Sequence, residues 1–221
     1  RRDVSLVRRS YGRWDSLVYM AQVWKALRRM RDYDVVQIIN PMFLEMKSER
    51  IRPIYEYLRK HNKRMFMGAY GMDYYWVNTC RTTQTFRYSD FNFGDRLRTD
   101  DIAMTEVRDW IGTDKGRLNQ EIAADCDGIA AGLYEYYACY HPAFPDKTEF
   151  IPFPINTDTT VRTAPPVTDK VRFFIGVQKS RGMYKGTDVM LRALERVADR
   201  HPDRCEIVKA ESVPFPVYQH M

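Results

Sequence analysis

Short apolar runs alternate with segments of helical period along most of this chain, and this alternation constrains the fold more than any other feature. The apolar runs predict strands at residues 34–39, 64–69, 128–131, 148–151, 171–177 and 205–209. Apolar residues at helical spacing predict helices at residues 15–30, 48–61, 116–124 and 133–139, from Thr187, and near Pro216. Strands that alternate with helices favour an α/β fold with an open, mostly parallel sheet and helices on both faces.

A proline-containing stretch divides the sequence into two predicted domains. Residues 153–168 combine prolines, threonines and aspartates and are expected to form an interdomain linker. Residues 1–152 then form a first Rossmann-like domain that lacks its first strand, and residues 169–221 begin a second. Two strands and one helix are too few for a stable domain, so we expect the second domain to continue beyond Met221. Residues 74–100 show no clear period and are expected to form a functional loop or lid.

Cysteine usage and hydropathy narrow the class of protein. The four cysteines, Cys80, Cys126, Cys139 and Cys205, show no CxxC spacing. This pattern disfavours metal ribbons and disulfide frameworks and is typical of reduced thiols in a cytosolic protein. No apolar run approaches the roughly 20 residues that a membrane-spanning helix needs, and no secretory signal is visible. We therefore expect a cytoplasmic protein.

Positive charge is concentrated in the first third of the chain. Residues 1–64 hold 16 Lys and Arg side chains against 7 Asp and Glu, whereas the whole chain carries a formal net charge of +6. This bias predicts either an anionic partner, such as acidic lipid headgroups or nucleic acid, or a solvated helix surface. Between Trp24 and Arg31 cations alternate with apolar residues, which suits a helix lying on a surface. We expect peripheral contact with the inner face of an anionic membrane and no nucleic-acid partner.

The segment from Val171 to Leu194 carries the clearest functional signal, because a buried strand is followed by a basic loop and then a helix. The loop holds three cations and three glycines, namely Gly176, Lys179, Arg181, Gly182, Lys185 and Gly186. Thr187 is expected to cap the helix, as Asp15 or Ser16 is for the first helix of the chain. Free backbone N–H groups and the helix dipole favour an anion at such a place. The loop is predicted to bind phosphate, and the alternative is a loop of solvent-exposed cations.

Three motifs in the second half of the chain occur in an order typical of one enzyme family. They are EIAADCDGIAAGLYEYY, TEFIPFPINTDTT and VRFFIGVQKSRGMYKGTDVMLRALERV. In this order and spacing they resemble the retaining GT-B glycosyltransferases related to glycogen and sucrose synthases (group 1 glycosyltransferases). Those enzymes carry an "aD-iia-s" strand, a "viPnGvDt" crossover, and then a strand with Gly, Arg and a Lys-Gly pair. The resemblance covers residues 120–221 well and the earlier residues by architecture only.

This resemblance implies a GT-B fold and a metal-independent, retaining glycosyltransferase of the hexosyltransferase type. The enzyme would transfer a sugar from a nucleotide-diphosphate sugar to a saccharide or lipid-linked saccharide, as in surface polysaccharide synthesis, and needs no cofactor. The donor diphosphate would be bound by Gly176, Lys179, Arg181, Lys185 and Gly186. Val177 stands where the family has an arginine, so Lys179 or Arg181 must supply that charge. The family's pair of glutamates would fall beyond Met221.

The segment Tyr70-Gly71-Met72-Asp73 follows a predicted strand, at the end where doubly wound folds bind ligands. It resembles the family's "His-Gly-x-Asp" segment with Tyr70 in the histidine position. Tyr70 and Asp73 are therefore the implied catalytic residues, and Asp73 would orient the acceptor hydroxyl. The expected acceptor contacts are Gly71, Tyr74 and Trp76. From the residues alone, a helix cap is an equally good interpretation of Asp73. An aromatic cluster such as Tyr74, Tyr75 and Trp76 more often packs in the core or a loop than stacks on a sugar.

Two further patterns favour structural interpretations. Asp125-Cys126-Asp127 spells DxD, a metal–nucleotide signature of another glycosyltransferase fold, but here it is predicted to join a helix end to a strand start. The four histidines show no metal-binding spacing, so no metal site is expected. The competing function is a non-catalytic GT-B-like or basic module that binds nucleic acid or an anionic membrane surface.

Overall fold

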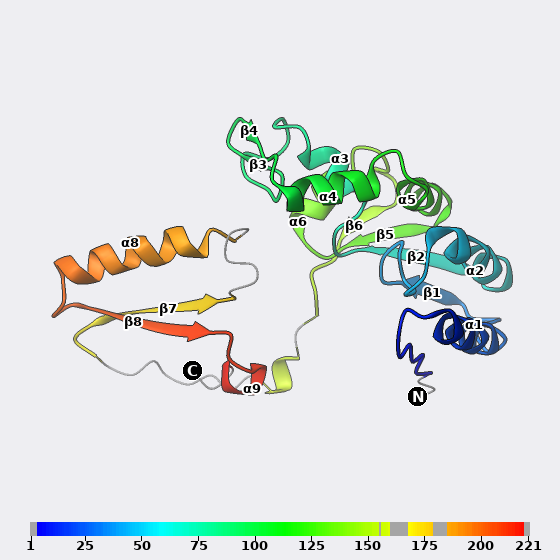
Figure 1. The fold of residues 1–221 in the computed structure, drawn as a ribbon, viewed down its shortest axis with the longest axis horizontal. Helices are drawn as coiled ribbons and strands as arrows, with labels where there is room; N and C mark the ends of the chain where they lie inside the picture. The colour runs from blue at the N-terminus through cyan, green and yellow to red at the C-terminus, as the bar shows by residue number, and fades with distance from the viewer. Residues whose placement is uncertain (1–3, 155, 160–167, 179–184, 219–221) are drawn as a thin grey trace. The chain divides into compact units, whose positions relative to one another are not determined.

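A computed structural model describes residues 4–154, 156–159, 168–178 and 185–218 (Figure 1). The chain forms two compact units, Arg1–Ile155 and Asn156–Met221, and each is described by itself. Within the described residues, no helix combines the length and the apolar character needed to cross a membrane.

The first unit is built on a four-stranded parallel sheet. Its strands are β1 (Val35–Ile38), β2 (Arg64–Ala69), β5 (Gly128–Ala131) and β6 (Thr148–Phe150), in the order β1-β2-β5-β6 (Figure 1). Every neighbouring pair is parallel. All four residues of β5 are buried, so both faces of this central strand are covered, as its unbroken apolar sequence predicts. The predicted α/β fold with a parallel sheet is therefore confirmed.

Six helices accompany this sheet among the described residues. They are α1 (Arg13–Leu27), α2 (Ser48–His61), α3 (Tyr74–Cys80), α4 (Asp101–Trp110), α5 (Asp114–Asp125) and α6 (Tyr134–Tyr140). In α2 the apolar residues at helical spacing, among them Ile51, Ile54 and Leu58, are all buried. Helix α2 packs against α5, and α3 packs against α4, α5 and α6. The core of the unit lies between these helices and the sheet.

Two predicted helix N-caps, Asp15 or Ser16 for the first helix and Thr187 for the helix after β7, are wrong. Helix α1 begins at Arg13 with Gly12 as its N-cap residue, not at Asp15 or Ser16. The Ser16 hydroxyl instead donates back to the Gly12 carbonyl oxygen at 2.8 Å, a bond made inside the first turn. Helix α8 (Thr187–Arg200) has Gly186 as its N-cap residue, because Gly186 takes the left-handed conformation (φ 60°) that glycine adopts readily.

The stretch 74–100 holds more regular structure than predicted. It contains α3 and an antiparallel pair, β3 (Asn92–Phe93) and β4 (Arg96–Leu97), and α4 follows it directly. Asp100 is the N-cap residue of α4, and its side chain accepts a hydrogen bond from the backbone N–H of Ala103. An aspartate at this position is a sequence signal for a helix start. Helix α3 is too short for its sequence period to show, and it is stabilised by tertiary contacts.

The Asp125-Cys126-Asp127 motif joins α5 to β5, as predicted. Helix α5 ends at Asp125, Cys126 is its C-cap residue and β5 begins at Gly128. Both carboxylates are engaged, because Asp125 accepts from the Tyr55 hydroxyl at 2.7 Å and Asp127 pairs with Arg59 at 2.7 Å. Asp127 also accepts from the Met65 backbone N–H. This motif therefore ties α5, α2 and β2 together.

The second unit contains two parallel strands, β7 (Val171–Val177) and β8 (Cys205–Glu211), paired along their whole length. Helix α8 connects them and packs along both, as Figure 1 shows. Short helical turns lie at Thr157–Thr159 and in α9 (Phe215–Tyr218). Among the apolar residues of α8, Val189, Met190 and Val197 remain 53%, 50% and 40% exposed. The described part of this unit therefore buries little apolar surface.

Replacement of Gly116 by alanine is expected to destabilise the first unit by more than about 2 kcal/mol. A Cβ atom there would collide with the backbone carbonyl oxygen of Trp110, and backbone yields less easily than a side chain. That collision should outweigh the roughly 1 kcal/mol that alanine gains over glycine inside a helix. Urea unfolding followed by circular dichroism measures the change. Gly71→Ala is the control, because a Cβ at Gly71 meets nothing within 4 Å, and equal effects of the two substitutions would contradict the prediction.

Candidate functional site

A cavity lies at the carboxyl ends of β7 and β8. Its volume is about 460 Å³, and it is lined by Gly176, Val177, Gln178, Lys185, Ala210, Ser212, Val213 and Tyr218. We call it the β7–β8 pocket. The carboxyl edge of a parallel α/β sheet is where such folds bind ligands, because the loops there can be shaped without disturbing the sheet.

The backbone at the end of the strands shapes this pocket. Val177 and Glu211 are register partners, so both strands end at the same level. The chain then turns at Ser212, which has a left-handed φ of 49° and donates its N–H to the Val177 carbonyl oxygen at 2.9 Å. A non-glycine residue in this conformation carries a small strain, and such positions gather at functional sites.

Helix α8 starts beside the pocket with its first turn uncapped by a side chain. Gly186 is the N-cap residue, and its carbonyl oxygen accepts from the N–H groups of Val189 and Met190 at 3.1 Å. The earlier N–H groups of a helix have no partner within the helix, and with the dipole they favour an anion. The acidic residue in this turn, Asp188, is paired with Arg192 at 3.0 Å and does not line the pocket.

Among the described residues that line this pocket, Lys185 is the one cation. It lines the pocket directly before Gly186, its side chain is exposed, and it has no ion-pair partner among the described residues. Across the pocket, the Tyr218 ring lies close to Gly176, where an added Cβ would meet its hydroxyl oxygen at 3.3 Å. Gly176 therefore leaves room for the Tyr218 ring. The centroid of this ring also lies 5.4 Å from that of the Phe174 ring.

The structure thus brings part of the predicted diphosphate site together. Gly176 and Lys185 line one pocket, and Gly186 begins the adjoining helix. Lys179 and Arg181 lie outside the described residues. Sequence reasoning missed Ser212 and Tyr218; the position of Ser212 directly after a strand was a usable signal, whereas the position of Tyr218 depends on the fold.

The predicted residues of the first unit lie at the carboxyl end of β2. Tyr70 directly follows this strand. Its hydroxyl accepts a hydrogen bond from the Gln37 side-chain amide at 2.9 Å, and its ring packs on that of Phe153 with the ring centroids 5.0 Å apart. Gly132, at the end of β5, must stay small because a Cβ there would meet both rings at 2.7 Å. Tyr70 and Gly71 are half-buried, so a ligand at this edge can reach them.

Asp73 lies behind this edge, inside the protein. It is 1% exposed and caps α3, because its Oδ1 accepts from the Trp76 backbone N–H at 2.9 Å. Its Oδ2 accepts from the Tyr140 hydroxyl at 2.9 Å, and the Asn119 amide donates to that hydroxyl at 3.1 Å. Burial raises the pKa of the Asp73 carboxyl to about 6, although hydrogen bonds to it act in the opposite direction. The cap interpretation of Asp73 is therefore the one that the structure shows.

The aromatic residues after Asp73 pack inward as well. Trp76 is 8% exposed and packs against the rings of Phe86 and Tyr136, with ring centroids 5.5 Å and 5.3 Å apart. The backbone N–H of Tyr74 donates to the Asn119 side chain at 2.9 Å, and its ring meets that of Tyr75 edge-on. The packing interpretation applies to Trp76, and a direct contact between its ring and a sugar would require α3 to move.

The buried Asp73 is expected to make the stability of the first unit depend on pH. Its pKa is about 6 in the folded chain and ordinarily 3.8, so between these values the unfolded chain binds fewer protons. The free energy of unfolding should therefore fall as the pH rises from about 4 to about 6, by about 3 kcal/mol, and stay level above that. Asp73→Asn keeps an oxygen for the cap but does not titrate. Urea unfolding between these pH values should show the fall in the wild type alone, and parallel curves would contradict it.

Comparison with known proteins yields no relative. No protein-family model matches the chain, and no curated protein or solved structure matches it either. The fold seen here, a parallel sheet with helices, serves many unrelated activities. Function must therefore be argued from the β7–β8 pocket and from the carboxyl edge of the first sheet.

Proposed function

We propose that this protein is a GT-B glycosyltransferase that binds the diphosphate of a nucleotide sugar in the β7–β8 pocket. One observation carries the proposal. Lys185 lines a pocket at the carboxyl ends of two parallel strands, directly before the left-handed Gly186 that begins α8 without a side-chain cap. A cation beside the N-terminus of a helix is a favourable place for a diphosphate.

The chemistry of sugar transfer requires such a place. When the bond between the sugar and the diphosphate breaks, negative charge grows on the departing phosphate. Fixed cations and helix N–H groups that already point at this charge stabilise the transition state. Lys185 and the start of α8 would do this, and Lys179 and Arg181 are proposed as further cations. The resemblance to metal-independent, retaining enzymes supports a mechanism of this kind.

The dimensions and lining of the pocket agree with a nucleotide ligand. A volume of about 460 Å³ lies within the usual range for small-molecule sites. The Tyr218 ring offers an aromatic face beside the side-chain-free surface of Gly176. We propose that this face contacts the nucleoside and that Lys185 contacts the diphosphate.

The acceptor, a saccharide or lipid-linked saccharide, is proposed to contact Tyr70 and Gly71 at the carboxyl end of β2. Asp73, Tyr74 and Trp76 then act behind these two residues, because their hydrogen bonds and ring contacts hold the segment in place. In this arrangement Asp73 is a positioning residue and not a group that touches the acceptor hydroxyl.

Release of nucleoside diphosphate from UDP-, GDP- and ADP-sugars tests this proposal. The wild type should release the diphosphate from one nucleotide series, faster when an oligosaccharide acceptor is added, and the glycoside formed should keep the anomeric configuration of the donor. Lys185→Ala should slow the release by about tenfold to a hundredfold, because one charge-assisted contact is lost. Equal rates in the wild type and in Lys185→Ala would contradict the assignment of the pocket.

A non-catalytic binding role is the second candidate. The burial of Asp73 favours it, since this carboxylate was predicted to orient the acceptor hydroxyl and it does not reach the surface. A GT-B-like binding module would bind a nucleotide sugar without releasing the diphosphate. A module for nucleic acid would instead show binding to DNA or RNA that weakens steeply with salt.

A further inference from the structure

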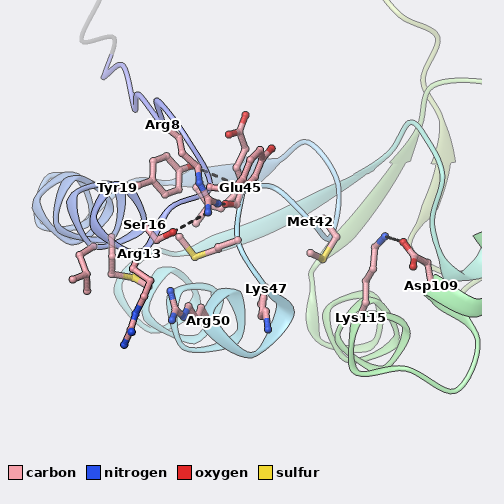
Figure 2. Close-up of a pocket in the computed structure, with 15 residues that line it drawn as sticks. Arg8, Arg13, Ser16, Tyr19, Met42, Glu45, Lys47, Arg50, Asp109 and Lys115 are labelled. Carbon is pink, nitrogen blue, oxygen red and sulfur yellow. Dashed lines mark hydrogen bonds and ion pairs between the residues drawn. The ribbon is translucent and has the colours of Figure 1, made fainter.

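A second cavity lies in the first unit, between the starts of α1 and α2. Its volume is about 1050 Å³. Its lining combines five cations, two carboxylates and a set of apolar and hydroxyl-bearing side chains: Arg8, Tyr11, Arg13, Ser16, Leu17, Tyr19, Met20, Met42, Leu44, Glu45, Met46, Lys47, Arg50, Asp109 and Lys115. We call it the α1–α2 pocket, and Figure 2 shows it with its lining side chains.

The topology explains why cations gather here. The loop that follows β1 supplies Met42 to Lys47, so the pocket lies at the carboxyl edge of the parallel sheet. Helix α2 begins at this edge, and the pocket is also lined by Arg13, the first residue of α1, and by Lys115, the second residue of α5. The starts of three helices therefore line one pocket, and each contributes a cation.

Three of these cations are free to bind a ligand. Arg13, Lys47 and Arg50 are exposed and have no ion-pair partner among the described residues. Figure 2 shows Arg13 projecting from the start of α1, and Lys47 and Arg50 from the start of α2. Neither helix start has a side-chain cap, and the acids in their first turns, Asp15 and Glu49, do not line the pocket. The backbone therefore adds to the positive potential.

The other two cations are held by the protein and form the walls of the pocket. The Arg8 guanidinium donates to the Ser16 hydroxyl at 2.9 Å and to the Glu45 backbone carbonyl oxygen, and it lies over the Tyr11 ring. Lys115 pairs with Asp109 at 3.4 Å. These contacts hold Arg8 and Lys115 in place. Of the two lining carboxylates, Asp109 is paired with Lys115, and Glu45 has no ion pair among the described residues.

The rest of the lining is apolar and adaptable. Its apolar part comes from Leu17 and Met20 of α1 and from the loop residues Met42, Leu44 and Met46. Thioether side chains fit ligands of irregular shape because they are flexible and polarisable. The volume also exceeds by far what a bare inorganic anion would fill. The ligand that suits this lining has an anionic head and an apolar body.

We propose that the α1–α2 pocket binds a phosphate ester with an apolar substituent, with Arg13, Lys47 and Arg50 on the phosphate. Two sources share this chemistry, a soluble phosphorylated compound and the headgroup of an anionic lipid. The site belongs to the first unit and uses no residue of the β7–β8 pocket, so it stands whether or not the protein transfers sugars.

Calorimetric titration with hexyl phosphate, inorganic phosphate and 1-hexanol tests this site. Hexyl phosphate should bind the wild type at least about tenfold more tightly than either other compound, because it alone supplies both halves of the ligand. The variant Arg13→Gln/Lys47→Gln/Arg50→Gln should weaken this binding by about a hundredfold. The matched control is Lys25→Gln/Arg29→Gln/Lys60→Gln, which removes the same charge from exposed positions outside the pocket and should change the affinity less than about threefold.

Vesicles of phosphatidylcholine, with and without phosphatidic acid, separate the two sources. Binding to the phosphatidic acid vesicles that the pocket variant loses and the control variant keeps assigns the site to a lipid headgroup. Binding of hexyl phosphate without vesicle binding assigns it to a soluble ester. Because all six positions are exposed, both variants should keep the wild-type circular dichroism spectrum, and Arg50→Gln alone provides a milder test. The proposal is overturned if hexyl phosphate binds no better than inorganic phosphate, or if both triple variants lose affinity equally.

Discussion

Tyr140→Ala is expected to lower the free energy of unfolding of the first unit by about 4–8 kcal/mol. Tyr140 is fully buried, and its ring packs on that of Tyr75 with the centroids 4.4 Å apart. Removal of the ring therefore leaves a cavity that costs about 3–5 kcal/mol. Its hydroxyl also joins Asp73 to Asn119. Loss of that hydroxyl leaves two buried polar groups short of a partner, at roughly 1–3 kcal/mol.

The variant Tyr140→Phe separates the two contributions. It keeps the ring and removes only the hydroxyl, so the loss should be about 1–3 kcal/mol. The pKa of Asp73 should rise further as well, because the hydrogen bond from Tyr140 lowers it. Urea unfolding at neutral pH measures both losses. Equal stability of Tyr140→Phe and the wild type would show that the buried network does not support the α3 start.

Lys185→Ala is expected to weaken the binding of a nucleoside diphosphate by about tenfold to a hundredfold. The lysine is the described cation of the β7–β8 pocket, and a charge-assisted hydrogen bond is worth about 1.5–3 kcal/mol. Isothermal titration calorimetry with UDP, GDP and ADP measures the change. The loss should be larger for the diphosphates than for the matching nucleosides, because the lysine would contact the phosphates.

Arg196→Ala is the matched control for Lys185→Ala. Arg196 is an exposed cation of α8, lies outside the pocket and has no ion-pair partner among the described residues. Its removal changes the net charge of the chain by the same amount. An affinity loss as large as that of Lys185→Ala would mean that the nucleotide responds to overall charge and not to a site.

Strong local patterns allowed much of the fold to be predicted from the sequence. The bounds of α2, β2 and β5 agree with their predicted ranges, because buried apolar residues recur there with the period of the element. Helix starts were harder to place, since Gly12 and Gly186 act as N-cap residues without offering a side chain. The short α3 has no readable period and depends on its neighbours.

The candidate sites were predictable only where they follow a strand directly. Tyr70 does so, whereas Gly176, predicted in the loop, is the second-last residue of β7; the structure places both at a carboxyl edge. The burial of Asp73 depends on Tyr140, which lies 67 residues further along the chain, and no local pattern reveals such a partner. The basic first third of the chain was visible as a charge bias, but the fold decides that Arg13, Lys47 and Arg50 share one pocket.

Thermal unfolding of the wild type with UDP-, GDP- and ADP-sugars is the most direct test of the central claim, that the β7–β8 pocket binds a nucleotide-sugar diphosphate. A ligand that binds only the folded state raises the unfolding temperature in proportion to its affinity. We predict that one of the three nucleotide series raises it, and that Lys185→Ala loses most of this rise while Arg196→Ala keeps it. If none of the three series stabilises the wild type, or if Lys185→Ala responds as the wild type does, the claim is contradicted.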